Sequence, residues 1–343
     1  MHSNKSIKVS LLATPDTSPS TLFGIFDVLS SVGIGWETFV SGSKPSPKFD
    51  VSIVAVDKKP FLCGGCGGSV LITPHSSTYE AFDTDIAIVG SFIAPDSLSV
   101  RHHDEREVEW LIKLKERGAL LSAMCTSSVL LAEAGILDGY DATTFWVYRD
   151  LARIRYPKVK WRIDQVLCVS GSNDQIVTAG GSTVWQELVL YLIERYCGVE
   201  QANNAAKLWV IPNRTHGQQP FATRTISHSH DDKIIGHCQS WAEENYSVVN
   251  PVNGMMELSG LASSTFARRF RQATGERPID YIHMLRLEKA KALLEENSRN
   301  IDEIGKMVGY EDPTSFRRIF KRKIGMTPKT YRLSFGKVRF TRN

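Results

Sequence analysis

The stretch Thr265-Phe-Ala-Arg-Arg-Phe-Arg-Gln-Ala-Thr-Gly275 returns in altered form 50 positions later as Ser315-Phe-Arg-Arg-Ile-Phe-Lys-Arg-Lys-Ile-Gly325. The matched positions are Phe266, Phe270, Gly275, Pro278 and Tyr281 in the first copy and Phe316, Phe320, Gly325, Pro328 and Tyr331 in the second. An internal repeat defines the unit from which a fold is built. We predict that this unit is a short helix, a tight turn and a second helix.

The residues of each copy predict where its helices begin and end. Phe266 and Phe270 stand at i and i+4, so they share one buried face of a helix. We expect Ser263-Ser264-Thr265 to supply the N-cap, and Gly275 to end the helix. In the second copy, Asp312-Pro313 opens the helix, because proline is tolerated in the first turn.

A shorter helix is predicted just before each copy. These helices lie near Met255–Ser259 and Ile301–Val308, and they end in Gly260 and Gly309. A short helix, a glycine turn and a second helix form a helix-turn-helix motif. The sequence therefore predicts an all-α domain with two such motifs.

The outward faces of the two repeated helices carry short hydroxyl groups and cations. Arginine reads guanine edges in bidentate fashion, and serine or threonine contacts bases or phosphates. A solvated basic helix face is the alternative, but the duplication of the pattern favours DNA contact. The predicted DNA-binding residues are Ser264, Thr265, Ala267, Arg268 and Arg271 in the first copy and Thr314, Ser315, Arg317, Arg318 and Lys321 in the second.

The charge of the chain is distributed unevenly. The 343 residues hold 41 Lys and Arg against 37 Asp and Glu, a net charge of +4. Residues 221–343 carry a net charge of +7, whereas residues 1–220 carry −3. After Asp312 there are ten Lys or Arg and no acidic residue. Such a basic region favours binding to phosphates.

The run from about Asp232 to Phe335 resembles the AraC/XylS family of bacterial transcription regulators. The residues that carry the resemblance include the two repeats, the helix Leu285-Arg-Leu-Glu-Lys-Ala-Lys291 and the segment Ile304-Gly-Lys-Met-Val-Gly-Tyr-Glu-Asp-Pro-Thr-Ser-Phe316. The family implies two helix-turn-helix units joined by a long helix, here about Pro278–Glu296. It also implies that the recognition helices enter adjacent major-groove segments on one face of DNA.

Residues 1–210 alternate between strand and helix patterns. The expected strands are Lys8–Ala13, Glu37–Val40, Val51–Val56, Asp85–Val89, Ala119–Ser122 and Gln175–Thr178. The expected helices are Thr21–Ser31, Asp104–Arg117, Ser127–Ala134, Thr183–Tyr196 and Glu200–Trp209. This alternation predicts a flavodoxin-like α/β domain with a mostly parallel sheet, whose ligands bind beyond the carboxyl ends of the strands.

Cys125 stands where an apolar strand runs directly into a helix, in Ala119-Leu-Leu-Ser-Ala-Met-Cys-Thr-Ser-Ser128. This is the position of a nucleophile in a strand-to-helix elbow. The positive end of the helix dipole predicts a lowered pKa for such a thiol. The alternative is a buried cysteine that serves as a small apolar residue.

This segment, together with Leu131-Ala-Glu-Ala-Gly-Ile-Leu-Asp-Gly-Tyr-Asp-Ala-Thr-Thr144 and Val177-Thr-Ala-Gly-Gly181, resembles the class I glutamine amidotransferase-like superfamily, which includes intracellular proteases and deglycases. The nearest resemblance is to regulators that fuse this domain to an AraC module. Active members place a histidine where this chain has Phe145, and a glutamate where it has Thr21 or a neighbour. Without an adjacent base, a Cys-His mechanism cannot be assembled. We therefore expect a ligand pocket without catalysis, formed by Cys125, Thr126, Phe145 and Ser91.

The sequence thus predicts an amidotransferase-like sensor domain over 1–212, a linker over 213–232 and an AraC-type DNA-binding domain over 233–343. The expected partners are double-stranded DNA, a small-molecule effector and a second copy of the chain, with RNA polymerase as a further candidate. No cofactor or metal is expected, because Cys63-Gly-Gly-Cys66 lacks the four ligands of structural zinc. With no apolar run of membrane-spanning length and no signal peptide, a cytoplasmic protein is expected. The competing function is a Cys125-dependent amidase, deglycase or protease tethered to DNA.

Overall fold

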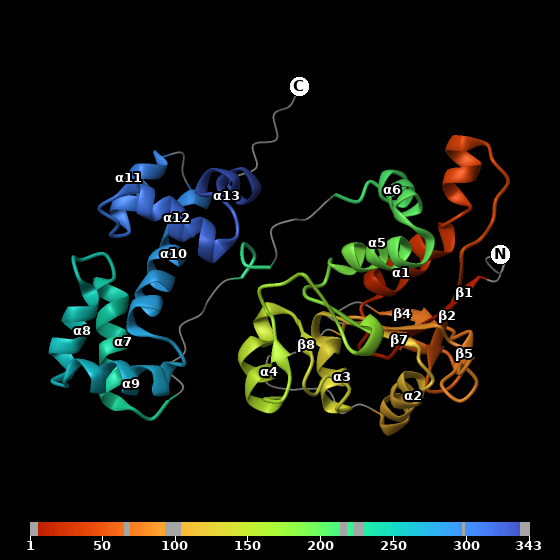
Figure 1. Cartoon of the computed structure of the whole chain (residues 1–343), viewed down its shortest axis with the longest axis horizontal. Helices are drawn as coiled ribbons and strands as arrows, with labels where there is room; N and C mark the ends of the chain where they lie inside the picture. The colour runs from red at the N-terminus through yellow and green to blue at the C-terminus, as the bar shows by residue number, and fades with distance from the viewer. Residues whose placement is uncertain are drawn as a thin grey trace. The chain divides into compact units, whose positions relative to one another are not determined.

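The computed structural model describes residues 6–64, 69–92, 104–212, 218–222, 230–296 and 299–336. The chain divides into two compact units, Met1–Gln218 and Gln219–Asn343 (Figure 1). This division falls within the segment 213–232 that the sequence analysis assigns to the linker. Among the described residues, no helix is long and apolar enough to cross a membrane.

A seven-stranded sheet forms the centre of the first unit. Its strand order is β10-β11-β7-β6-β1-β2-β5, and only the pairing of β10 with β11 is antiparallel. The strands are β1 (Ile7–Leu12), β2 (Phe49–Ala55), β5 (Ser76–Ser77), β6 (Ile86–Val89), β7 (Leu120–Met124), β10 (Leu167–Ser170) and β11 (Ile176–Ala179). Two small sheets pair β3 (Phe61–Cys63) with β4 (Val70–Ile72) and β8 (Asp141–Ala142) with β9 (Lys160–Trp161). The predicted flavodoxin-like fold is confirmed.

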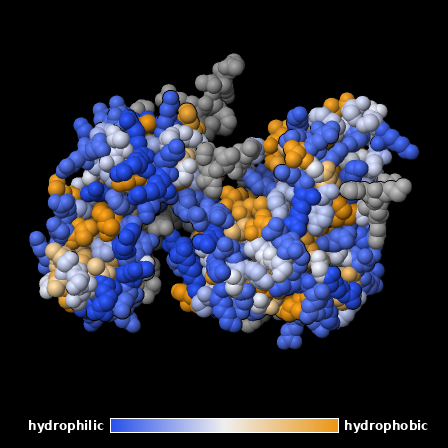
Figure 2. All heavy atoms as spheres, in the orientation of Figure 1, coloured by the Kyte–Doolittle hydropathy of each residue, from blue (hydrophilic) through white to orange (hydrophobic). Residues whose placement is uncertain are grey.

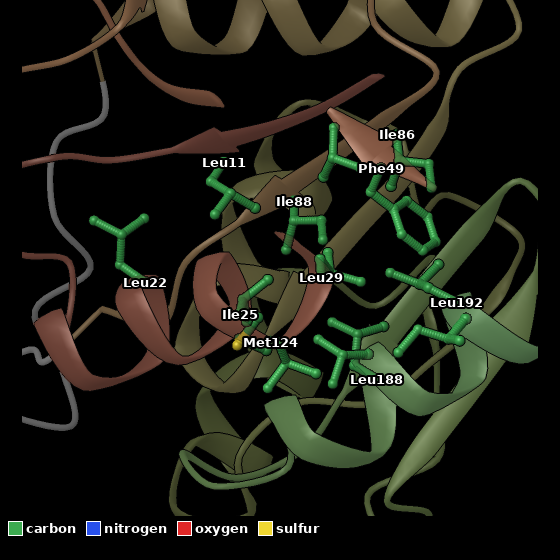
Figure 3. Packing of buried hydrophobic residues seen from close by; sticks show 14 of the residues in the cluster. Leu11, Leu22, Ile25, Leu29, Phe49, Ile86, Ile88, Met124, Leu188 and Leu192 are labelled. Carbon is green, nitrogen blue, oxygen red and sulfur yellow. The ribbon is translucent and has the colours of Figure 1, made fainter. Parts of the chain in front are cut away.

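Helices cover both faces of this sheet, so successive strand residues belong to different cores. Leu11 lies in a cluster with α1 (Pro19–Ser31) and α5 (Trp185–Cys197), whereas Leu12 lies in a cluster with α2 (Glu105–Glu116) and α3 (Ser128–Glu133). Figure 3 shows the first cluster, where Leu22, Ile25 and Leu29 of α1 and Leu188 and Leu192 of α5 gather near Leu11 and Ile88. The remaining helices are α4 (Arg149–Arg155) and α6 (Val199–Leu208). Burial on both faces explains why a central strand such as β6, Ile86-Ala-Ile-Val89, is apolar throughout.

The expected strand Glu37–Val40 is wrong. These residues form a short π-helix, η1 (Glu37–Ser41), which continues the turn begun by the hydrogen bond from Thr38 N to Ile34 O. The run Thr-Phe-Val has high strand propensity, but propensity yields to context. Phe39 and Val40 are 79% and 56% exposed, so neither side chain fills a sheet core.

The second unit is helical, and the face visible in Figure 2 is mostly hydrophilic. Its helices are α7 (Lys233–Asn245), α8 (Pro251–Ser259), α9 (Ser263–Thr274), α10 (Pro278–Glu296), α11 (Ile301–Met307), α12 (Pro313–Ile324) and α13 (Pro328–Phe335). Helices α8 and α9 form one helix-turn-helix motif, and α11 and α12 form the other. The long helix α10 joins them, as the resemblance to the AraC/XylS family implies.

The repeated residues form an equivalent aromatic core in each motif. The ring centroids of Phe266 and Phe270 lie 5.6 Å apart, and those of Phe270 and Tyr281 lie 5.4 Å apart. The corresponding second-copy distances are 5.7 Å from Phe316 to Phe320 and 5.6 Å from Phe320 to Tyr331. Aromatic pairs at this spacing are attractive beyond the area that they bury. The repeat therefore records a duplicated packing unit.

The glycines of the repeat also keep one role, because both end their helices in the left-handed region. The φ angles are 76° at Gly275 and 86° at Gly325. The helix starts differ, however. Asp312 caps α12 by accepting hydrogen bonds from Thr314 N at 3.0 Å and Ser315 N at 2.8 Å. The N-cap of α9 is Ala262, which makes no side-chain cap, so the prediction that Ser263-Ser264-Thr265 supplies the cap is wrong.

Arg286 of α10 connects the two motifs. Its buried guanidinium donates to Tyr246 O at 2.8 Å and Val248 O at 3.0 Å, just before α8. The same group lies 5.2 Å from the ring centroid of Tyr310, which precedes α12. Tyr310 also stacks on His283, and their Nδ1 and hydroxyl atoms lie 3.0 Å apart. Helix α10 therefore contacts the chain just before α8 of the first motif and just before α12 of the second.

Replacing Arg286 should test this connection. We expect Arg286→Met to lower the free energy of unfolding of residues 219–343 by about 1.5–3 kcal/mol, because it removes hydrogen bonds from a buried charged donor. Arg277→Met is the matched control, since Arg277 stands just before the same helix and makes a surface ion pair with Asp280, with its own side chain 69% exposed. The control should lose less than about 1 kcal/mol. Urea unfolding followed by circular dichroism measures both, and equal losses would contradict the assigned role.

Candidate nucleic-acid interface and ligand pocket

The recognition helices α9 and α12 present most of the predicted DNA-binding residues to solvent. The exposed residues are Ser264, Ala267, Arg268, Arg271, Thr314, Arg317, Arg318 and Lys321, and Thr265 and Ser315 are partly buried. Arg268 and Arg318 occupy the same position of the repeat, as do Arg271 and Lys321. The two helices therefore offer a matched pair of basic faces.

The cations on these faces differ in their contacts. Among the described residues, Arg318 and Lys321 have no ion pair, whereas Nη2 of Arg317 lies 2.5 Å from Oδ1 of Asp302. Arg268 is held loosely, with Nη1 3.5 Å from Oε1 of Gln272 on the next turn. Arg271 lies at the side, where it lines a groove along α10. Arg268, Arg318 and Lys321 are thus the cations most free to reach a ligand.

Two other cations of these helices are structural. Arg269 binds Asp232 through Nε at 2.5 Å and Nη2 at 3.0 Å, and its hydrogen bond lowers the pKa of that carboxyl group. Since Asp232 also caps α7, the pair ties α7 to α9. Lys323 binds Asp280 at 2.9 Å. Partial burial opposes ionisation of Asp280, but hydrogen bonds from Lys323 and Arg277 give it a lowered pKa.

Cys125 forms a strained elbow at the carboxyl end of β7. Its φ angle is 56°, and a 3₁₀ turn, η2 (Cys125–Ser127), leads from β7 into α3. A left-handed conformation at a residue other than glycine costs on the order of 1–3 kcal/mol. Neighbouring hydroxyls hold it, because Ser127 Oγ donates to Val89 O at 3.0 Å and Thr126 Oγ1 donates to Phe92 O at 2.6 Å.

The predicted lowering of the Cys125 pKa is wrong. The side chain is only 2% exposed, and burial raises the pKa of the thiol. The hydroxyls of Ser91, Ser182 and Thr126 oppose this effect without reversing it. The Sγ atom lies 3.6 Å from Ser182 Oγ. Desolvation outweighs the dipole here, since α3 has only six residues and begins after the 3₁₀ turn.

The structure brings three of the four predicted pocket residues together. Ser91, Cys125 and Thr126 meet around the sulfur atom. Phe145 follows Thr144, whose Oγ1 donates to Cys125 O at 2.7 Å. Its half-buried ring packs on the neighbouring Trp146 and Tyr148, at centroid distances of 5.3 and 6.4 Å. Those neighbours form η3 (Trp146–Tyr148).

Several residues near the elbow are absent from the predicted set of pocket residues. They are Ser182, Thr144, Gly180 and Gln218. The run Gly180-Gly181 is visible in the sequence as part of the amidotransferase-like resemblance, and it marks the strand end beside Cys125. The sequence also suggests that the segment Gln218-Gln-Pro-Phe221 packs on the first domain, and Gln218 does so. Its position beside the elbow depends on tertiary structure.

The metal and CxxC candidates are described only in part. No group of three or more His, Cys, Asp or Glu there could hold a metal ion. The Sγ of Cys63 donates to Thr17 O at 2.9 Å, and burial raises the pKa of this thiol to about 11. Its partner in the CxxC spacing, Cys66, lies outside the described residues. Elsewhere in the first unit, a short 3₁₀ helix, η4 (Ser172–Asp174), connects β10 to β11.

Comparisons with known proteins agree with this architecture. A model of the DJ-1/PfpI family matches residues 11–195, and a model of a helix-turn-helix domain matches residues 256–334. Because the first match covers more than half of the sequence, the chain belongs to the DJ-1/PfpI family.

Curated relatives are named as transcription regulators. The HTH-type transcriptional regulator CdhR of Pseudomonas aeruginosa is 27% identical over 226 residues, 64% of this chain and 65% of the relative. The regulator GbdR of the same species is 24% identical over 263 residues, 76% of this chain and 69% of the relative. The alignment with CdhR thus spans slightly less than two thirds of that protein.

A solved AraC family transcriptional regulator from Pseudomonas putida is 16% identical with a TM-score of 0.48, covering 59% of this chain and 99% of its own. The resemblance to AraC-type regulators fused to an amidotransferase-like domain is confirmed.

The raised pKa of Cys125 predicts slow thiol chemistry. Between pH 6 and 8 the thiol stays mainly protonated, and thiolate accumulates only as the pH rises above the ordinary range for cysteine. Iodoacetamide should therefore alkylate Cys125 in the folded chain more slowly than in the urea-unfolded chain at the same pH. Peptide mass spectrometry measures both rates. Faster reaction in the folded chain at pH 6–7 would instead indicate an activated nucleophile.

Proposed function

We propose that this protein is a DNA-binding transcription regulator whose DJ-1/PfpI domain binds a small-molecule effector without catalysing a reaction. The observation that carries the proposal is the duplicated helix-turn-helix motif, with equivalent arginines exposed on α9 and α12. The relatives CdhR and GbdR are named HTH-type transcriptional regulators, which supports the same function.

The proposed DNA-binding surface consists of the exposed cations Arg268, Arg318 and Lys321. The contacts of Arg286 between the two motifs support its geometry. Arg268 and Arg318 stand at equivalent positions, so each recognition helix has an arginine for base edges. Lys321 supplies charge without planar geometry, which suits phosphate contact. The contacts of Arg286 support a fixed spacing between α9 and α12, and hence between the two DNA segments that they read.

The effector site in this proposal is the elbow around Cys125. Ligands of open α/β sheets bind at the carboxyl ends of strands, where Cys125, Ser91 and Thr126 meet. The positive φ of Cys125 matches a nucleophile elbow, but two features favour sensing over catalysis. The thiol has a raised pKa, and Phe145 stands where the amidotransferase-like resemblance expects a histidine.

Assembly completes the proposal. The DJ-1/PfpI unit pairs with a second copy, so that two helical units bind repeated DNA half-sites with an affinity raised by effective concentration. RNA polymerase is the further partner by which binding would alter transcription. The cell compartment in this proposal is the cytoplasm, where bacterial DNA is accessible.

Binding to DNA should be measurable with residues 219–343 alone. The ten Lys and Arg after Asp312 lead us to expect strong dependence on salt. If six or more phosphates are neutralised, the affinity should fall about 10³-fold or more between roughly 50 and 200 mM salt. Fluorescence anisotropy with a duplex measures this slope. Failure to bind any duplex at low salt would reject the proposed function.

Substitutions on α12 should separate base contact from phosphate contact. Arg318→Ala should cost about 1–3 kcal/mol on a duplex enriched by selection with the wild-type chain, and much less on random DNA. Lys321→Ala, the matched control on the same face, should weaken both duplexes to similar extents and reduce the salt slope by about 1. Equal losses on the two duplexes for Arg318→Ala would argue against base readout by this arginine.

A further inference from the structure

Gln218 inserts a carboxamide into the first unit. The residue is 4% exposed, although it stands in a polar stretch of the sequence. Its Nε2 atom faces four oxygen atoms within hydrogen-bond distance. They are Gln165 O at 2.9 Å, Thr144 O at 3.1 Å, Thr143 Oγ1 at 3.2 Å and Ile163 O at 3.3 Å. Three of the four are backbone carbonyls, which only accept hydrogen bonds, so the slot is built for an N–H donor.

Gly180 makes room for this group. A Cβ atom on Gly180 would lie 1.8 Å from Nε2 of Gln218 and 2.4 Å from its Cδ. No side chain fits there while the carboxamide is in place. Glycine at position 180 therefore leaves the space that the Gln218 carboxamide fills.

The carboxamide is held on one side only. An amide nitrogen carries two hydrogen atoms, so four acceptors are more than it can satisfy at once. Its oxygen, Oε1, is buried and has no hydrogen-bond partner among the described residues. An unsatisfied buried acceptor opposes burial. The hydrogen bonds of the nitrogen therefore hold Gln218 in the slot, whereas the unpaired oxygen lowers the stability of the bound carboxamide. Such a balance suits a side chain that can be displaced.

The slot lies against the elbow of Cys125. Strands β11 and β7 pair in parallel with Ala179 opposite Met124, so Gly180 lies beside Cys125 at the same sheet edge. The chain segment that follows Gly180 also reaches the thiol, because Ser182 Oγ is 3.6 Å from its sulfur. Thr144 spans both sites as well, accepting from Gln218 through its carbonyl and donating to Cys125 O through its hydroxyl.

We propose that this slot is a carboxamide-binding subsite of the effector pocket, filled by Gln218 and open to a primary carboxamide of the effector in its place. Gln218 is the last residue of the first unit, and Gln219 begins the second. Displacement of Gln218 therefore frees the chain immediately before the DNA-binding unit. This regulatory step rests on the proposed function, whereas the chemistry of the slot does not.

Chemical rescue tests the slot in the full chain. Gln218→Ala removes the atoms of one acetamide molecule, and Gly180→Ala places a methyl group where the amide would bind. Thermal unfolding by tryptophan fluorescence reports the first unit, since six of the seven Trp precede Gln218. We expect Gln218→Ala to melt at a lower temperature than wild type, with saturable recovery in acetamide. Acetate and N,N-dimethylacetamide, which lack the N–H₂ group, should give no recovery.

The controls decide between a specific slot and a general cosolvent effect. The double variant Gln218→Ala/Gly180→Ala should show no recovery in acetamide, and Gln219→Ala should melt like wild type at every acetamide concentration. Equal acetamide effects on all variants, or an unaltered melting temperature for Gln218→Ala, would overturn the carboxamide subsite.

The regulatory step is tested by DNA binding of the full chain to the selected duplex. Gln218→Ala should change the dissociation constant by about fivefold or more, the lower range of typical allosteric coupling, while Gln219→Ala leaves it unchanged. If wild type binds the duplex and Gln218→Ala binds it equally, the coupling is wrong. If wild type binds no DNA, the proposed function fails, and the rescue result still decides the slot.

Discussion

The hydrogen bonds of Arg286 set the geometry on which the helical unit depends. A single guanidinium on α10 binds two backbone carbonyls before α8 and lies over the Tyr310 ring before α12. Burial lowers the pKa of this group, although an arginine keeps its charge. Each motif has its own aromatic core, and α10 belongs to both, with Leu285 in one cluster and Leu287 in the other. Arg286 stands between these two residues and adds polar contacts to the packing along α10.

The Cys125 elbow is the corresponding constraint in the first unit. The backbone keeps the left-handed turn that exposes a nucleophile in related folds, and serine and threonine hydroxyls hold that turn in place. The surroundings of the sulfur are apolar or hydroxylic, so burial determines its pKa. The backbone shape of a nucleophile elbow is thus combined here with a thiol whose pKa is raised.

The parts of the structure that the sequence predicted are those controlled by local periodicity. Phe266 and Phe316 reveal the motifs because packing at i and i+4 leaves a direct mark on the sequence. The failures arise where two local signals compete or where distant residues decide. Thr38-Phe39-Val40 has the propensity of a strand but continues a helical turn. The pKa of Cys125 depends on how deeply the sulfur is buried, and Gln218 acquires a role only when the chain returns to Gly180.

The different starts of α9 and α12 make the two halves of the repeat chemically unequal. Asp312 satisfies the first amide groups of α12, and those hydrogen bonds keep its carboxyl group ionised by lowering its pKa. Helix α9 begins at Ser263, and its N-cap residue, Ala262, makes no such side-chain hydrogen bond. In the function that we propose, a DNA site read by one chain therefore has polarity. Its two segments are not interchangeable, and inverting the site relative to a gene reverses the direction of the bound protein on the double helix.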